Sequence, residues 1–82
     1  MEEIKRKGNV FSCEFNGMQI RWAIGEDCSD MNGNAEEKLK QCLQTAIGLS
    51  GKMWQVAFVL NKSLPFPSKL YVNGKEVKYP KN

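Results

Sequence analysis

Polar and apolar positions alternate most regularly between Asn9 and Ile24, on both sides of the dipeptide Asn16-Gly17. Asn-Gly flanked by alternating apolar residues is the strongest local indication of a β-hairpin with a two-residue type I′ turn. Such a turn places opposite each other residues whose numbers sum to 33: Phe15 with Met18, Cys13 with Ile20, Phe11 with Trp22, Glu14 with Gln19, and Ser12 with Arg21. The first three pairs are apolar and the last two are polar. The sequence therefore predicts a hairpin with one buried face and one solvated face.

A helical pattern follows over residues 35–49. Apolar residues recur there at the i, i+3, i+4, i+7 and i+8 spacing of one helix face: Leu39, Cys42, Leu43, Ala46 and Ile47. Asn34 is expected as the N-cap, with Glu37 at the capping-box position three residues later. Gly48 or Gly51 can end the helix. We expect an amphipathic helix that packs this apolar face, Cys42 included, on the core.

The run Met53–Leu60, MWQVAFVL, has apolar residues at both odd-numbered and even-numbered positions, which would be the two faces of a strand, and it contains β-branched and aromatic residues. It is shorter than a typical helix, so the pattern predicts a central strand with both faces covered. Trp54 is then expected in the core, as is Trp22. Residues 61–68 contain two prolines, which cannot continue a strand within a sheet and predict an extended loop.

A second Asn-Gly pair, Asn73-Gly74, predicts a shorter hairpin over residues 69–79. Opposing residues have numbers that sum to 147: Leu70 with Val77, Tyr71 with Glu76, and Lys69 with Lys78. The last pair sets two like charges opposite each other, which is typical of a solvated or edge position.

These elements predict an α+β fold, with a mainly antiparallel sheet and one helix packed on one face, in the order ββαβ(ββ). The order is compatible with a β-grasp-like arrangement, although a comparison by element order alone implies no function. The 82 residues are expected to form a single small domain over 1–82, with 1–8 and 80–82 loosely held.

The composition argues against several classes of protein. No apolar run approaches the roughly 20 residues that cross a bilayer, and no apolar segment typical of a signal peptide follows the first residues. The three cysteines, Cys13, Cys28 and Cys42, are widely spaced, which favours a cytoplasmic protein. Histidine is absent, and no set of residues supplies a base, a nucleophile and an oxyanion donor. We therefore expect no enzyme, no cofactor and no metal.

Two weak motifs have simpler explanations. The acidic residues 26–34 resemble the start of a calcium loop, but Ala35 and Gln41 stand where that loop needs glycine and glutamate. The stretch Gly48-Leu49-Ser50-Gly51 matches the GxxG loop of KH domains, which lies between two helices, whereas a strand is expected here. We interpret the first as a polar loop, which could also meet a basic partner, and the second as a helix end.

Charge is divided unevenly along the chain. Residues 1–37 contain four basic and eight acidic residues, a net charge of −4, whereas residues 38–82 contain eight lysines and one glutamate, a net charge of +7. Lysines flank an aromatic ring on the second hairpin, where the candidate nucleic-acid-binding residues are Lys69, Tyr71, Lys75 and Lys78. Such a surface can contact a phosphate backbone or unpaired bases, although a solubilising edge face would carry lysines as well.

Phe66 lies between two prolines and has two explanations. It either closes one end of the core or serves as an exposed anchor for a partner protein. The sequence favours a small intracellular protein-interaction module or a bacterial or phage regulator, without catalytic activity, whose partner is another protein. It would bind through Phe66 or through the outer face of the sheet. The alternative is a nucleic-acid-binding accessory protein that uses the basic second hairpin; no membrane partner is expected.

Overall fold

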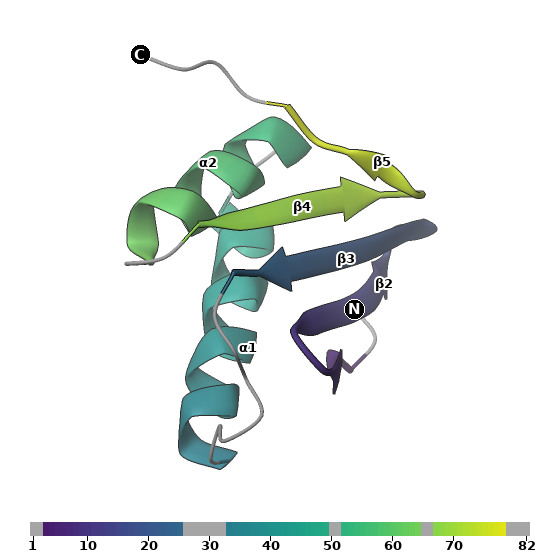
Figure 1. Ribbon diagram of the computed structural model, residues 1–82. Coiled ribbons are helices and arrows are strands. Elements are labelled where there is room, and N and C mark those ends of the chain that lie inside the picture. Colours follow the sequence, from purple (N-terminus) through teal and green to yellow (C-terminus); the bar gives the residue numbers. More distant parts are fainter. Residues whose placement is uncertain (1–2, 26–32, 50–51, 65–66, 79–82) are drawn as a thin grey trace.

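A computed structural model describes residues 3–25, 33–49, 52–64 and 67–78. Five antiparallel strands pack against two helices (Figure 1): β1 (Lys5–Lys7), β2 (Val10–Phe15), β3 (Met18–Ile24), α1 (Gly33–Leu49), α2 (Met53–Ser63), β4 (Ser68–Val72) and β5 (Lys75–Glu76). The predicted α+β class is confirmed. The prediction of a single helix is wrong, and the observed order does not reproduce the element order on which the β-grasp-like comparison rested.

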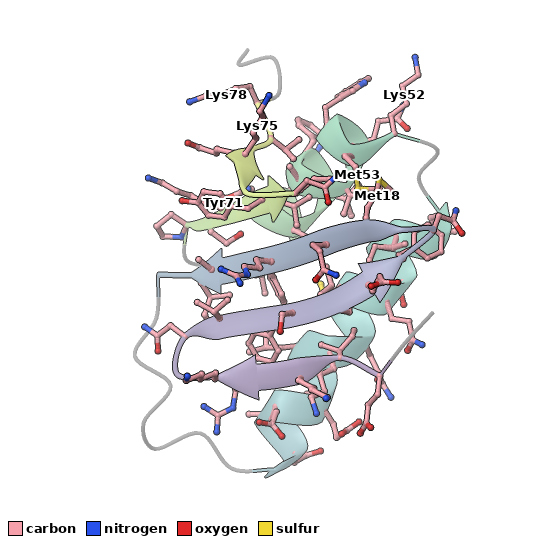
Figure 2. The ribbon with its side chains drawn as sticks, turned by 90° about the vertical axis from the view of Figure 1, so that its right-hand side faces the viewer. Met18, Lys52, Met53, Tyr71, Lys75 and Lys78 are labelled. Atoms are coloured by element: carbon pink, nitrogen blue, oxygen red, sulfur yellow. The ribbon has the colours of Figure 1, made fainter. Side chains whose placement is uncertain are left out.

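The sheet has the strand order β1-β2-β3-β4-β5, so every strand pairs with its neighbour in the chain. β3 and β4 are adjacent although both helices lie between them in the sequence. The two helices lie on one side of the sheet, behind the strands as seen in Figure 2. We call this side the inner face and the opposite side the outer face; none of the described elements covers the outer face.

The first hairpin has the predicted register at every pair. Asn16 and Gly17 have φ values of 51° and 79°, the positive values that a type I′ turn requires. Phe11, Ile20 and Trp22 are fully buried on the inner face, and the ring centroids of Phe11 and Trp22 lie 5.5 Å apart. The alternation of apolar and polar residues therefore assigned both faces of this hairpin correctly.

β1 was not predicted from the sequence, because it consists of the charged tripeptide Lys5-Arg6-Lys7. Its register sets Arg6 opposite Phe11, so Arg6 lies on the inner face and its two neighbours on the outer face. The guanidinium of Arg6 donates a hydrogen bond to Glu36 in the first turn of α1. This ion pair joins an edge strand to the helix that covers it, and Ile4 is buried beside it.

α1 buries Leu39, Leu43, Ala46 and Ile47, the face that the spacing predicts. Cys42 is only half-buried at the margin of the core, and this burial raises the pKa of its thiol. The helix begins at Gly33, two residues before the predicted start. Asn34 therefore lies inside the first turn, and the prediction of Asn34 as the N-cap is wrong.

The predicted strand over residues 53–60 is wrong, because this segment forms α2. The buried residues of α2 are Val56, Ala57 and Leu60, a spacing that places them on one side of a helix. Trp54 is 39% exposed, so its expected place in the core is also wrong. α2 packs against both α1 and β4, and two neighbours require a wide apolar face. That wide face produced the apolar character on both alternations that indicated a strand.

Backbone and side-chain hydrogen bonds join the ends of the two-helix segment to the sheet. The N–H of Gly25, after β3, donates to the carbonyl of Pro67, before β4, at 2.9 Å. A Cβ on Gly25 would lie 2.8 Å from that oxygen, so this approach needs glycine. Asn61, near the end of α2, accepts a hydrogen bond from the N–H of Ser68 at 3.0 Å. These contacts seat β4 beside β3.

The second hairpin has the predicted turn and a shorter ladder. Tyr71 lies opposite Glu76, and the N–H of Val77 donates to the carbonyl of Leu70 at 2.8 Å, but β5 ends at Glu76. Asn73 also contacts the first hairpin: its Oδ1 accepts from the N–H of Gln19 at 2.9 Å, and its own N–H donates to the carbonyl of Gln19 at 2.8 Å. The two Asn-Gly turns therefore lie at the same end of the sheet.

The helical character of α2 predicts unequal effects of two truncations. Leu60→Ala should lower the free energy of unfolding by about 2 to 5 kcal/mol, because Leu60 is 1% exposed. Trp54→Ala should lower it by less than Leu60→Ala does, because its ring is partly solvated. Urea denaturation measures both values. In a strand the two side chains would share one face, so similar losses would contradict the helix.

The Arg6–Glu36 pair predicts a pH-dependent contribution to stability. The hydrogen bond from Arg6 holds the pKa of Glu36 below its ordinary value of 4.5; desolvation opposes this shift and the nearby Lys40 charge supports it. A carboxyl with a lowered pKa in the fold stabilises it above the unfolded pKa, and the contribution is lost as pH falls through the folded pKa. Glu36→Gln should therefore lower the Tm at neutral pH, and the difference should shrink below pH 4.5 and vanish once the pH is below the lowered pKa of Glu36. A difference that persists at strongly acid pH would contradict the assignment.

Candidate nucleic-acid interface on the outer face of the sheet

Alternation along each strand fixes which side chains lie on the outer face, because the buried residues of the same strands point to the helices. The outer-face residues of the five strands are Lys5, Lys7, Val10, Ser12, Glu14, Gln19, Arg21, Ala23, Lys69, Tyr71 and Glu76. The set is rich in cations and contains one aromatic ring.

Cross-strand pairing aligns most of these residues in two rows across the sheet. The first row is Lys5, Ser12, Arg21, Tyr71 and Glu76, and the second row is Lys7, Val10, Ala23 and Lys69. Neighbouring strands lie about 4.8 Å apart, so Arg21 is next to Tyr71, and Lys7 and Lys69 are about 14 Å apart. The cations are therefore distributed over the width of the sheet.

Four outer-face cations are exposed and take part in none of the ion pairs among the described residues: Lys5, Lys7, Arg21 and Lys69. The two outer-face acids have polar partners. Glu14 accepts a hydrogen bond from Nε2 of Gln19 at 2.9 Å, and Oε1 of Glu76 lies 3.4 Å from Nζ of Lys78. Among the described residues, the five strands therefore present four cations and two acids on the outer face, a net charge of +2.

A hollow of 320 Å³ lies on the outer face beside Tyr71, lined by Val10, Arg21, Ala23, Tyr71 and Gly74. Tyr71 is half-buried, and Arg21 lies directly opposite it on β3. Val10 and Ala23 face each other in the neighbouring row and are short apolar side chains. An aromatic ring, a guanidinium and an apolar floor are thus brought together from three strands and one turn.

The structure divides the four candidates of the second hairpin between two sides. Lys69 and Tyr71 lie on the outer face. Lys75 is paired with Val72, whose side chain packs on the core, so Lys75 lies on the inner side of the edge strand. Lys78 is exposed and close to Glu76. Figure 2 shows Tyr71 on β4, with Lys75 and Lys78 at the β5 edge.

Lys5, Lys7 and Arg21 were missed as binding residues, because they belong to the half of the chain with a net negative charge. Pairing in the sheet, which joins residues far apart in sequence, brings Arg21 beside Tyr71 and places Lys5 and Lys7 on the same face, three strands away. The period-two spacing of Lys5 and Lys7 could have identified these two residues, and the register of the first hairpin had already placed Arg21 on its solvated face. Glu36 and Glu37 of the same half lie on α1 on the other side of the sheet, whereas Glu14 lies on the outer face.

Several sequence hypotheses fall on residues that the structure does not describe: Phe66, Cys28 and the acidic stretch 26–32. Within the described ranges, no group of three or more acidic, cysteine or histidine residues could hold a metal ion. The same ranges contain no helix that is long and apolar enough to cross a membrane.

Comparisons of the chain with protein-family models, with curated proteins and with solved structures found no match.

Proposed function

We propose that the protein binds nucleic acid through the outer face of its sheet. The observation that carries the proposal is a set of four exposed cations on a face that no described element covers, Lys5, Lys7, Arg21 and Lys69, which form no ion pair with another described residue. Lysine and arginine bind nucleic acid by neutralising phosphates and releasing condensed counterions, a contribution that is independent of sequence. Three strands supply these cations, so the fold itself forms the surface.

The spacing of the cations favours a polymer over a small anion. Side chains that bound one phosphate would converge on it within hydrogen-bonding distance. The Cα atoms of these four residues are instead separated by about 7 to 16 Å along and across the strands. A chain of phosphates can contact several of them at once, whereas a single phosphate contacts one or two.

The proposal predicts a steep dependence on salt. If the protein neutralises four phosphates of a single-stranded oligonucleotide, a plot of log K against log salt concentration should have a slope of about −3. Affinity should then fall about 50-fold between about 50 and 200 mM salt. Fluorescence anisotropy with a labelled oligonucleotide of mixed sequence measures this slope. Binding that does not change with salt would contradict the proposal.

A pair of charge-matched variants separates the outer face from net charge. Lys7→Glu combined with Lys69→Glu should weaken binding at least about tenfold, because two phosphate contacts become repulsive. Lys38→Glu combined with Lys52→Glu changes the net charge equally on exposed residues of the helical side, and should retain most of the affinity. Equal losses in the two variants would refute the outer face as the binding surface. Circular dichroism verifies that both variants fold.

Protein binding, the function that the sequence favoured, is the second candidate. Phe66 lies outside the described residues, but Leu49 at 80% and Trp54 at 39% are exposed apolar side chains of the helices. A partner bound through these helices would be lost from a Leu49→Gln, Trp54→Gln variant and retained by the Lys7→Glu, Lys69→Glu variant. Oligonucleotide binding would instead be lost from the Lys7→Glu, Lys69→Glu variant and retained by the Leu49→Gln, Trp54→Gln variant.

A further inference from the structure

We infer that the hollow beside Tyr71 is a subsite for one unpaired base, so that the ligand of the outer face is single-stranded nucleic acid. This inference rests on the proposed function, because the four outer-face cations would hold the backbone while the hollow takes the base. It adds a preference that charge alone does not give: phosphate contacts are made by single and double strands alike.

The lining of the hollow suits a base. Aromatic side chains on open sheets bind unpaired bases by stacking, which tolerates any base because each has a π-face. Tyr71 provides the ring, and the facing pair Val10 and Ala23 leaves room next to it because both side chains are short. A volume of 320 Å³ is near the lower end of the range of about 300 to 1,000 Å³ typical of small-ligand sites.

Arg21 lies opposite Tyr71 and lines the same hollow. Its planar guanidinium can bind the phosphate of the nucleotide whose base stacks on Tyr71, or stack on that base itself. Lys69 is two residues before Tyr71 on β4 and lies on the same face. The ring thus has a cation on the neighbouring strand and another on its own strand, which places phosphate contacts on two sides of the base.

A second hollow of similar size provides a contrast. It measures 330 Å³, lies between α1 and α2, and is lined by Lys38, Gln41, Cys42, Thr45, Ala46, Val59 and Ser63. It contains no aromatic ring and one cation, so it lacks the stacking surface that a base needs. The hollow beside Tyr71 differs from it by chemistry rather than by volume.

Duplex nucleic acid cannot use the base subsite without paying for strand separation. In a duplex each base is stacked on its neighbours and paired with its complement, and extruding one costs a few kcal/mol. The outer face should therefore bind a single strand more tightly than a duplex of equal length, at a salt concentration where both bind.

The test compares oligonucleotides and two substitutions of Tyr71 by fluorescence anisotropy. Tyr71→Leu keeps an apolar side chain but removes the ring, and should weaken single-strand binding about 5- to 150-fold. Tyr71→Phe keeps the ring and should bind like the wild type. Neither variant should change the salt slope, because neither removes a cation. Equal affinity of Tyr71→Leu and the wild type would overturn the inference.

An abasic oligonucleotide distinguishes stacking from a structural effect. This probe keeps the phosphates and lacks the bases, so Tyr71→Leu and the wild type should bind it equally. If Tyr71→Leu binds the abasic probe more weakly than the wild type does, Tyr71 acts through the fold or through backbone contacts, and the inference is overturned. If single and double strands bind equally, the subsite is refuted while the proposed function stands. If neither strand binds, the proposed function fails as well.

Discussion

The cross-strand register of β2 and β3 is the constraint on which the rest of the molecule depends. The turn at Asn16-Gly17 sets it through two positive φ values, and these are conformations that few side chains adopt. Side chains alternate with a period of two, so a slip of one residue would exchange the two faces. Arg21 would then point at the helices and Trp22 at solvent. The same register therefore determines both the core and the cationic outer face.

The sheet also explains how cations from both halves of the chain come to lie on one surface. Glu36 and Lys40 lie on α1 on the inner side of the sheet, where Nζ of Lys40 is 3.7 Å from Oε2 of Glu36. Arg6 on the edge strand β1 also pairs with Glu36. On the outer face, Lys5, Lys7, Arg21 and Lys69 take part in no ion pair among the residues that the structure describes. Charged residues from both halves of the chain therefore meet on one face of the sheet, and the division into an acidic and a basic half does not describe the folded surface.

Short-range signals allowed the hairpins to be predicted from the sequence. Asn-Gly fixes the turn, and the turn fixes which residues oppose each other, so the pairs Phe11–Trp22 and Tyr71–Glu76 needed no knowledge of the remaining chain. α2 was different, because residues with β-branched and aromatic side chains became helical through packing against α1 and β4. Tertiary contacts override local propensity in such a segment. β1 escaped prediction because its three charged residues carry no apolar pattern.

The candidate site was predictable only in part, because pairing in the sheet joins residues that are far apart in the sequence. Lys69 and Tyr71 were identified because they lie close together in sequence. Arg21 and Lys5 join them through the β3–β4 and β1–β2 pairings, which connect residues about 50 positions apart in the first case. A binding surface that spans several strands is assembled by the sheet, and its members need not be neighbours in the chain.

Mapping the bound surface by NMR tests the central claim most directly. A titration of ¹⁵N-labelled protein with a single-stranded oligonucleotide at low salt should shift the amide and side-chain signals of Lys5, Arg21, Lys69 and Tyr71. Signals from the exposed side of α1 and α2 should stay in place. Shifts confined to the helices, or no shifts at all at saturating oligonucleotide, would contradict the assignment of the outer face as a nucleic-acid interface.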